Sequence, residues 1–388
     1  MKKIGIITIS RTNNYGAELQ AYATQKKMQL LGYDAELIDY LYYKHRNHKE
    51  TKDSEPAIAF SKKEKWKHTF LYRMVSPFYE DFVSSFVKKI KTRKENFKNF
   101  HKNNTKYSKE YKSIEELYKA NHSYDVFIAG SDQIWNPSTG TSMAPYFLEF
   151  APKDKIKMSF ASSFGVSEID EKYYCLYKNY IANLDVIGVR EEDGVKLVKE
   201  ISGREGTRVL DPTLLLNKEE WKEVIIKPIR RKKKYLIIYV LHESETLIKI
   251  AHYLQEKLGF EIIKLTKRAY SNAVYPKVIN LEDQGPDGYI DLFMNAAFVL
   301  TNSFHGTAFS TNFNVPFFAV LNRERKNNSR MVNFLKMVGL DDRIVWEGIS
   351  GFDELDVLFN LDFTNANQVL EKERKASIKY LTSNINKN

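Results

Sequence analysis

The chain has 388 residues, and because this length exceeds what a single hydrophobic core usually organises, two domains are expected. Its 43% hydrophobic and 28% charged residues exclude a largely disordered chain, and its single cysteine, Cys175, excludes an intrachain disulfide and paired-thiolate zinc sites, which favours a reducing cytoplasm. The formal charge of +11 indicates a negatively charged partner: a phosphorylated small molecule, a lipid diphosphate, a membrane surface or nucleic acid.

The first part of the chain alternates strand and helix patterns, as in a parallel sheet. Residues 4–9 are an apolar run that is too short for the core of a signal peptide and is expected to be the first strand. Residues 18–31 have helical spacing, and residues 35–39 form the next expected strand. Further strands are expected at 124–129, 157–161 and 185–189, with a helix at 171–184. We expect this half to be a domain spanning residues 1–212.

A basic segment at about residues 44–120 is expected to be a helical insertion in which lysines alternate with aromatic residues. Such a pattern can bind nucleic acid, or lie on a membrane with Trp66 and Phe70 on its apolar side. A third interpretation, in which the aromatic side chains pack on their own domain and the lysines face water, is favoured. Nucleic acid is not expected as a partner, whereas peripheral membrane contact stays open. No apolar run approaches the roughly 20 residues needed to cross a bilayer.

A second α/β domain is expected at residues 213–388, after the Asp211-Pro212 pair. Its strands are expected at 235–241, 261–265, 298–302 and 316–320, and its helices at 245–258, 289–296 and 306–313. The last helix, at 367–383, is expected to be exposed and to be able to pack back on the first domain.

Four loops share one expected layout, in which polar residues and a glycine follow a strand and lead into a helix. Glycine lets backbone amides approach a ligand, and the helix dipole attracts anions, so together these loops predict one ligand-binding cleft between the two halves. The candidate residues are Asn13, Asn14, Tyr15 and Gly16; Gly130 and Asp132; Ser163; and Asn302, Ser303, Gly306 and Thr307. For Asp132, holding magnesium beside a phosphate and capping a helix are equally open.

Two side chains at strand ends are candidates for chemistry. His305 follows the strand at 298–302 and is either an acid or base or, alternatively, a residue that caps a helix. Arg190 follows the strand at 185–189 and is expected to bind a phosphate or carboxylate. An ion pair with Glu191 or Glu192 is the alternative for Arg190, and it is disfavoured because adjacent residues on a strand face opposite sides.

Common cofactor signatures do not occur in the sequence. No Gly-x-Gly-x-x-Gly follows the first strand, and there is no phosphate-binding loop ending in Gly-Lys-Ser/Thr, no His-Glu-x-x-His and no calcium loop. We therefore expect no dinucleotide cofactor, no simple ATP hydrolysis and no dedicated metal site.

Six segments, in this order along the chain, resemble the polysaccharide pyruvyl transferase family. They are NNYGAELQAYA (13–23), DVFIAGSDQIWNP (125–137), SFASSFG (159–165), VREEDG (189–194), VLDPTLLL (209–216) and TNSFHGTAF (301–309). The resemblance implies an α/β fold of two Rossmann-like domains, similar to the glycosyltransferase B (GT-B) fold, with the helical basic insertion in the first domain.

The resemblance also implies a metal-independent transfer of pyruvyl from phosphoenolpyruvate to sugar hydroxyls, which forms a ketal on a bacterial exopolysaccharide or capsule precursor. In that family pattern His305 matches the acid or base, Arg190 matches a donor-binding arginine, and Asn14, Gly16, Gly130, Asp132 and Ser163 match cleft segments. Ser303 departs from the pattern, because better characterised members tend to have arginine at this position, two residues before the histidine. Ser303 and the architecture keep open a GT-B glycosyltransferase that uses a nucleotide sugar. The basic segment from Lys44 to Lys112 keeps open a noncatalytic membrane-associated assembly factor.

Overall fold

The computed structural model describes residues 1–41, 45, 47–49, 88–137, 142–266, 277–325, 328–349, 351–352, 355 and 359–387. Most of the N-terminal part of the expected basic insertion, including Trp66 and Phe70, lies outside these residues. The described residues form two compact units. Unit 1 contains the described residues of Met1–Val87, His101–Leu215 and Lys375–Asn388, and unit 2 contains those of Lys88–Phe100 and Leu216–Arg374.

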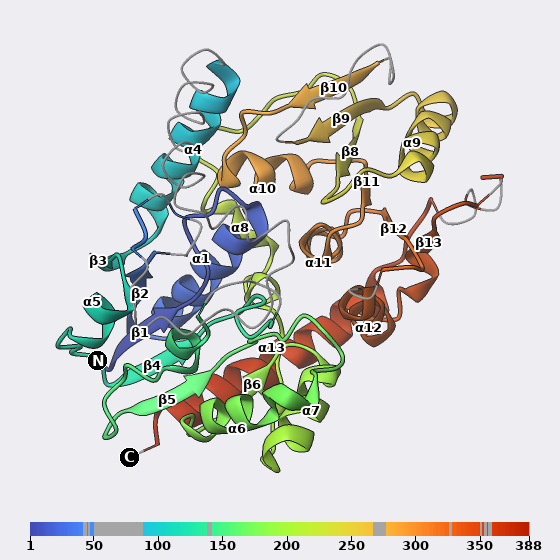
Figure 1. Ribbon diagram of the computed structural model, residues 1–388. Helices are drawn as coiled ribbons and strands as arrows, with labels where there is room; N and C mark the ends of the chain where they lie inside the picture. The colour runs from blue at the N-terminus through green and yellow to red at the C-terminus, as the bar shows by residue number, and fades with distance from the viewer. Residues whose placement is uncertain are drawn as a thin grey trace. The chain divides into compact units, whose positions relative to one another are not determined.

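Unit 1 is built on a five-stranded parallel sheet (Figure 1). The strand order is β3-β2-β1-β4-β5, with β1 at Lys3–Ile7, β2 at Asp34–Tyr40, β3 at Tyr107–Tyr111, β4 at Val126–Ala129 and β5 at Ile156–Ser159. A short pair, β6 (Gly188–Val189) and β7 (Thr207–Arg208), follows beyond β5. β4 is buried at all four residues because helices and loops cover both faces of the sheet, which is why its sequence is continuously apolar.

Helices connect the strands of unit 1. They are α1 (Tyr15–Leu30), the end of α4 (Lys88–Asn104), α5 (Ile114–Tyr118), α6 (Tyr174–Ala182) and α7 (Glu192–Ser202), with single turns at η1 (Ala144–Phe147), η2 (Glu171–Tyr173) and η3 (Pro212–Leu214). Helix α1 begins where the side chain of Asn14 accepts a hydrogen bond from the Gly16 amide, and it ends before Gly32, whose φ is +85°. That conformation favours glycine and stops the helix.

Unit 2 contains a six-stranded parallel sheet in the order β10-β9-β8-β11-β12-β13 (Figure 1). Its strands are β8 (Tyr235–Tyr239), β9 (Glu261–Leu265), β10 (Val278–Leu281), β11 (Phe298–Thr301), β12 (Phe317–Leu321) and β13 (Ile344–Trp346). Its helices are α8 (Lys218–Lys222), α9 (Glu245–Leu258), α10 (Pro286–Met294), α11 (Phe304–Phe313), α12 (Ser329–Met337) and the turn η5 (Asp341–Arg343). Both units thus have the 3-2-1-4-5 order of a Rossmann-like sheet, which confirms the predicted fold class.

Two helices are divided between the units. Helix α4 contributes its first part to unit 2 and its end to unit 1, and α13 (Thr364–Ile385) changes unit after Arg374. The second part of α13 packs in unit 1, where the Ser377 Oγ accepts a hydrogen bond from the Leu210 amide (2.9 Å) and the Tyr380 hydroxyl donates to the Ser159 carbonyl (3.0 Å). The last helix therefore has buried contacts in unit 1.

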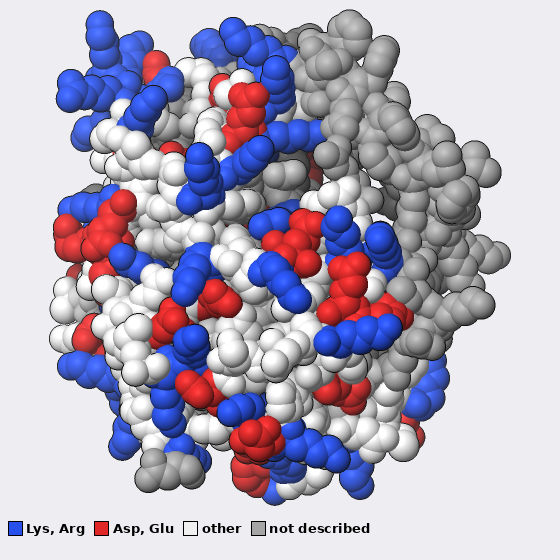
Figure 2. All heavy atoms as spheres, turned by 90° about the vertical axis from the view of Figure 1, so that its left-hand side faces the viewer, with Lys and Arg blue, Asp and Glu red and all other residues white. Residues whose placement is uncertain are grey.

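The segment expected to be a purely helical insertion also contains a strand. β3 pairs in parallel with β2 and extends the sheet at its edge, so that expectation was wrong for residues 107–111. Helix α4 buries Phe97 and Phe100 against its own chain, with 1% and 2% of their surface exposed. On the face drawn in Figure 2, acidic side chains lie among the basic ones. The described part of the segment thus follows the interpretation in which the aromatic residues pack inward.

Within the described ranges, no helix combines the length and the apolar character needed to span a bilayer.

Gly188 offers a test of how tightly β6 packs in unit 1. A Cβ atom at this position would lie 2.7 Å from the Ser159 carbonyl oxygen and 2.9 Å from a Tyr380 ring carbon. We predict that Gly188→Ala lowers the free energy of unfolding by about 1–3 kcal/mol, measured by urea titration. Gly206→Ala is the matched control, because its Cβ would meet only Val198 and Val195 at 3.6 Å or more. Equal stability of the two variants would contradict the packing described here.

Candidate functional site

The carboxyl edge of the unit 1 sheet carries the first group of candidate residues. In an open parallel sheet, ligands bind at this edge near the point where the strand order reverses, which lies between β1 and β4. The loops after these two strands contact each other, because the Thr8 hydroxyl donates to the Ser131 carbonyl (2.8 Å) and accepts from the Gln20 amide (3.0 Å). Two of the four predicted loops, those after β1 and β4, therefore lie together at the switch point of unit 1.

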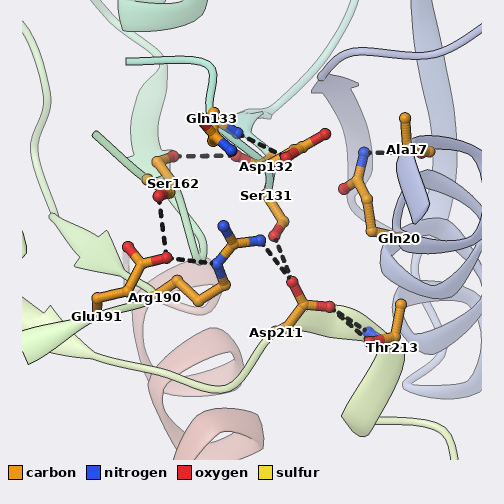
Figure 3. A network of polar contacts seen from close by, with 12 residues as sticks. Ala17, Gln20, Ser131, Asp132, Gln133, Ser162, Arg190, Glu191, Asp211 and Thr213 are labelled. Atoms are coloured by element: carbon orange, nitrogen blue, oxygen red, sulfur yellow. Dashed lines mark hydrogen bonds and ion pairs between the residues drawn. The ribbon is translucent and has the colours of Figure 1, made fainter. Parts of the chain in front are cut away.

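Arg190 is the centre of a buried polar network at this edge (Figure 3). Its Nε donates to Glu191 Oε1 (2.7 Å), and one of its terminal nitrogens donates to Asp211 Oδ2 (2.8 Å). The Arg190 side chain is 2% exposed and that of Asp211 is fully buried. Ser131 also donates to Asp211 Oδ2 (3.2 Å), and Ser163 donates to Glu191 Oε1 (2.9 Å). Arg190 thus ties the loops after β4, β5 and β6 to the segment before η3.

The ion pair between Arg190 and Glu191, which strand alternation argued against, is present. Strand β6 ends at Val189, and Glu191 is already the residue that precedes α7, so the alternation rule does not apply. Burial alone would lower the pKa of Arg190, but three carboxylates, of Glu191, Asp211 and Asp132, outweigh it and raise that pKa above its ordinary value. One guanidinium among three carboxylates does not favour a further anion, so in this arrangement Arg190 stabilises loops, and donor binding by Arg190 stays a prediction.

Asp211 was not among the predicted site residues. Its Oδ1 accepts hydrogen bonds from the amide (3.0 Å) and the hydroxyl (2.7 Å) of Thr213, while its Oδ2 faces Arg190 and Ser131. The available signal was the Asp-Pro-Thr sequence after an apolar run, since aspartate before proline is a frequent start of a helical turn. The local sequence gave no signal that Oδ2 of Asp211 would contact Arg190 and Ser131.

The loops after β4 and β5 differ from the predicted layout. Gly130 and the Ala161–Gly165 segment lead into turns and bends instead of helices, so the helix-dipole argument for anion binding is wrong at both. Gly130 packs closely on Thr8, because a Cβ would lie 2.9 Å from that side chain. Asp132 has φ +77° and accepts a hydrogen bond from the next amide, Gln133 N (2.8 Å), which is a local turn contact and not a helix cap.

The loop after β1 combines a helix cap with unusual backbone conformations. Asn14 is the N-cap of α1, Gly16 donates to it, and Tyr15 is buried. Arg11 and Asn13 have φ of 56° and 52°, a region that residues other than glycine rarely adopt. Such conformations cost about 1–3 kcal/mol each and concentrate at functional sites. The loop after β1 therefore remains a candidate part of the ligand-binding site.

A titratable cluster beside this loop was also missed by sequence reasoning. Arg11 pairs with the buried Asp39 (2.8 Å), and His101 Nε2 lies 2.6 Å from the buried Glu18 carboxylate. Burial raises the pKa of Asp39 to about 6, more than the attraction of Arg11 lowers it, and Glu110 adds to the rise. These residues come from the loop after β1 and from α1, β2, β3 and α4, so only the folded chain brings them together.

His305 lies at the carboxyl edge of the unit 2 sheet, in the first turn of α11. It follows β11, which with β8 forms the switch point of this sheet. Among residues 302–307, all of which are described, His305 alone is partly exposed. Its ring packs edge-on against Phe304, with 5.5 Å between centroids. His305 is therefore the one residue of this segment that keeps some exposed surface, although its Nε2 atom is buried.

The residues around His305 build the loop. Asn302 accepts a hydrogen bond from Leu241 N (2.8 Å) and donates to the His242 carbonyl (2.9 Å), which fixes the loop after β8. Ser303 is the N-cap of α11. Thr307 is buried and its hydroxyl lies 3.1 Å from the Met331 sulfur. Their side chains are thus engaged within the protein, and direct donor binding by them stays a prediction.

Gly306 is required by close packing at the start of α11. A Cβ at this position would lie 2.3 Å from the Thr301 Oγ1 atom, which itself donates to the Tyr239 carbonyl (2.6 Å). Glycine therefore lets the first turn of α11 approach the end of β11 and places His305 at the sheet edge. Among the described residues, no group of three or more His, Cys, Asp or Glu side chains is arranged to hold a metal ion.

Comparison with known proteins gives one family and one fold. The sequence profile of the family described as polysaccharide pyruvyl transferase matches residues 14–324. Among solved structures, the S. aureus MnaA–UDP co-structure aligns with a TM-score of 0.52 and 10% identity, covering 100% of this chain and 99% of that chain. The UDP-N-acetylglucosamine 2-epimerase from Rickettsia bellii aligns with a TM-score of 0.51 and 14% identity, covering 99% and 97%. No curated protein matches the chain significantly.

The Arg190 network predicts a large effect on stability. Arg190→Met removes the cation and leaves the buried carboxylates of Asp211 and Glu191 without their partner, which is expected to cost about 3–5 kcal/mol of unfolding free energy. The control is Arg208→Met, because Arg208 pairs with the exposed Glu192 and its loss is expected to cost less than about 1 kcal/mol. Urea denaturation measures both. A cost for Arg190→Met no larger than the control would refute the assigned structural role.

Asp39 predicts a pH dependence. Its pKa of about 6 lies above the ordinary value of 3.8, so between these values the folded protein binds more protons than the unfolded chain. The contribution of Asp39 to stability is therefore full below pH 3.8 and is lost as the pH rises through about 6. Asp39→Asn is expected to be more stable than the parent at pH 7 by about 1 kcal/mol, and this advantage should shrink toward pH 4.

Asp34→Asn provides a control of opposite sign, because a hydrogen bond from Lys106 lowers the pKa of Asp34. This variant should lose stability relative to the parent at pH 7 and approach it as the pH falls below 4. Urea midpoints for all three proteins from pH 3.5 to 7 make the comparison. If Asp39→Asn and Asp34→Asn respond to pH in the same direction, the assignment of a raised pKa to Asp39 fails.

Proposed function

We propose that this chain, which belongs to the polysaccharide pyruvyl transferase family and is a transferase, moves the pyruvyl group of phosphoenolpyruvate onto two hydroxyls of a sugar. The observation that carries the proposal is the family match over residues 14–324, combined with the partly exposed His305 among buried neighbours at the switch point of unit 2. The proposed acceptor is a bacterial surface polysaccharide precursor, as in an exopolysaccharide or capsule.

The proposed reaction needs one acid and a place for two alcohols. Protonation of the methylene carbon of phosphoenolpyruvate makes the adjacent carbon electrophilic, and one sugar hydroxyl adds to it. Phosphate then leaves with its bridging oxygen, and the second hydroxyl closes the ketal ring. The two protons released by the hydroxyls balance the proton on the new methyl group and the proton taken up by phosphate. No oxidant or reductant is required.

His305 is the proposed acid that protonates the methylene carbon, or the base that takes a hydroxyl proton. A histidine side chain exchanges protons near neutral pH, and a positioned acid or base contributes about 10²- to 10⁴-fold in rate. The first turn of α11 supplies backbone amides and a positive helix end, which stabilise the negative charge on departing phosphate. The reaction, as proposed, uses no metal and no cofactor.

The acceptor is proposed to be a lipid-linked sugar at the inner face of the cytoplasmic membrane. The formal charge of +11 supports this because a lipid diphosphate and an anionic membrane surface both attract a basic protein. A sugar acceptor that is not lipid-linked uses the same chemistry. The comparison of acceptors is made by mass spectrometry of free and lipid-linked sugars after reaction.

A nucleotide-sugar glycosyltransferase is the second candidate. It is favoured by Ser303, which stands where better characterised members of the family tend to have arginine, and it is compatible with the likeness of the fold to the MnaA–UDP co-structure. This likeness concerns the fold alone. Calorimetry with phosphoenolpyruvate and with uridine or guanosine diphosphate sugars separates the two: heat with phosphoenolpyruvate supports pyruvyl transfer, and heat with a diphosphate sugar alone supports glycosyl transfer.

The proposal predicts that His305→Gln lowers the rate constant of pyruvylation by about 10²- to 10⁴-fold while the thermal unfolding midpoint stays close to that of the parent. The side chain is partly exposed, so its loss removes little packing. The measurement is the release of phosphate together with the mass of the pyruvylated sugar. His252→Gln, on α9 in the same unit, is the control and should keep full activity. Full activity of His305→Gln would remove His305 from the mechanism.

A further inference from the structure

Unit 2 carries a run of basic residues that the candidate site does not use. Residues 224–234, here called the basic loop, connect α8 to β8. The basic loop contains no acidic residue and six basic ones, namely Lys227, Arg230, Arg231, Lys232, Lys233 and Lys234. Arg231 is partly buried, and the other five are exposed. A strong positive charge therefore lies on one short segment of the surface.

Two carboxylates of unit 2 hold the basic loop but leave most of its charge uncompensated. Glu261, on the neighbouring strand β9, pairs with Arg231 (3.1 Å). The buried Asp291 accepts a hydrogen bond from the Ile229 amide and so fixes the backbone in the middle of the loop. The exposed Glu223 precedes the loop. Within the described ranges, no carboxylate forms an ion pair with any of the five exposed cations.

An exposed apolar side chain lies near the start of the basic loop. Ile226 is 58% exposed, whereas the side chains of Trp221 and Val224 just before it are buried in the unit. Pro228 is exposed as well. A large apolar side chain among exposed cations is the combination with which peripheral proteins enter the interface of an anionic bilayer.

The basic loop lies at the amino edge of the unit 2 sheet. It ends directly before β8, and the Lys234 carbonyl accepts a hydrogen bond from the Glu261 amide at the start of β9 (3.0 Å). His305 follows the carboxyl end of β11, which pairs in parallel with β8. The loop and His305 therefore lie at opposite edges of one sheet, and the loop can be changed without altering the surroundings of the histidine.

The residues around the basic loop favour a membrane over a nucleic acid. Proteins that bind single strands combine cations with aromatic side chains on which the bases stack. The basic loop contains no aromatic residue, and the two that flank it, Trp221 and Tyr235, are 0% and 4% exposed. An anionic bilayer requires only the positive charge and an apolar side chain that can enter it, and both are present.

We propose that the basic loop binds unit 2 to an anionic lipid bilayer, with its five exposed cations at the headgroup phosphates and Ile226 at the boundary with the acyl chains. Each cation near such a surface strengthens binding by roughly fivefold, so the contact is reversible and depends on salt. The inference rests on the proposed function only for its purpose, which is to bring the chain to a lipid-linked acceptor. The binding itself requires neither donor nor acceptor.

The test is flotation of the full chain with vesicles of phosphatidylcholine alone and with vesicles that also contain phosphatidylglycerol. The parent is expected to bind only the anionic vesicles and to dissociate as the salt concentration rises. Exchanging Lys232→Gln, Lys233→Gln and Lys234→Gln together is expected to weaken this binding by about 50- to 200-fold. Ile226→Ser is expected to weaken it by about 3- to 10-fold.

The matched control removes the same charge from another part of the surface. Lys172→Gln, Lys196→Gln and Lys199→Gln are combined in one variant, because each of these exposed lysines pairs with a carboxylate in unit 1. This variant should bind the vesicles nearly as well as the parent. Both triple variants should pyruvylate a free sugar at the rate of the parent, since neither changes the neighbourhood of His305.

The outcomes separate this inference from the proposed reaction. A parent that does not bind anionic vesicles overturns the inference, and so do unchanged binding of the basic-loop variant and equal weakening of the two triple variants. Binding of a single-stranded oligonucleotide in place of the vesicles, with dependence on the same lysines, overturns the membrane as the partner. A parent that binds the vesicles but transfers no pyruvyl group supports the membrane contact and contradicts the proposed function.

Discussion

A buried guanidinium holds together the edge of unit 1 on which its candidate site depends. Arg190 bonds two carboxylates, Glu191 and Asp211, and each of these accepts a further hydrogen bond from a serine in a different loop. Parallel strands place their carboxyl ends at one edge, but nothing in a strand fixes how the loops beyond it lie. The ion network supplies that constraint, because a charge buried so completely is stable only with its partners in place.

In unit 2, neutral groups hold the loops at the carboxyl edge of the sheet. Asn302 bonds the backbone of the loop after β8, Ser303 caps α11, and Gly306 lets that helix start against Thr301. The other polar side chains of the segment are buried and make contacts within the protein, whereas His305 is partly exposed. Loop construction thus explains most of the polar side chains of this segment, and on the proposed function the reactivity of His305 explains the histidine.

The sequence was sufficient for the sheets, because buried parallel strands are continuous apolar runs and the helices between them begin at recognisable caps such as Asn14 and Ser303. It was insufficient for the short edge strands β3, β10 and β13, whose half-exposed residues give no such run. The sequence also gave a wrong prediction for the ion pair of Arg190, because that contact depends on the residue at which β6 ends. Arg190 and Glu191 would face apart on a strand, yet β6 ends one residue earlier. Contacts between distant segments, such as Arg190 with Asp211 or His101 with Glu18, have no local signal at all.

The charges of the two edges argue for different ligands. At the edge of unit 1, three carboxylates surround one guanidinium, which disfavours a donor that carries both a phosphate and a carboxylate but suits the hydroxyls of a sugar, since carboxylates accept hydrogen bonds from them. At the edge of unit 2, the positive charge of Arg325 near His242 is opposed by the carboxylates of Glu347 and Glu243, so the charges there are mixed, and the start of α11 beside His305 favours negative charge. On the proposed function, the sugar hydroxyls therefore suit the edge of unit 1, and an anionic donor beside His305 depends on the amides at the start of α11.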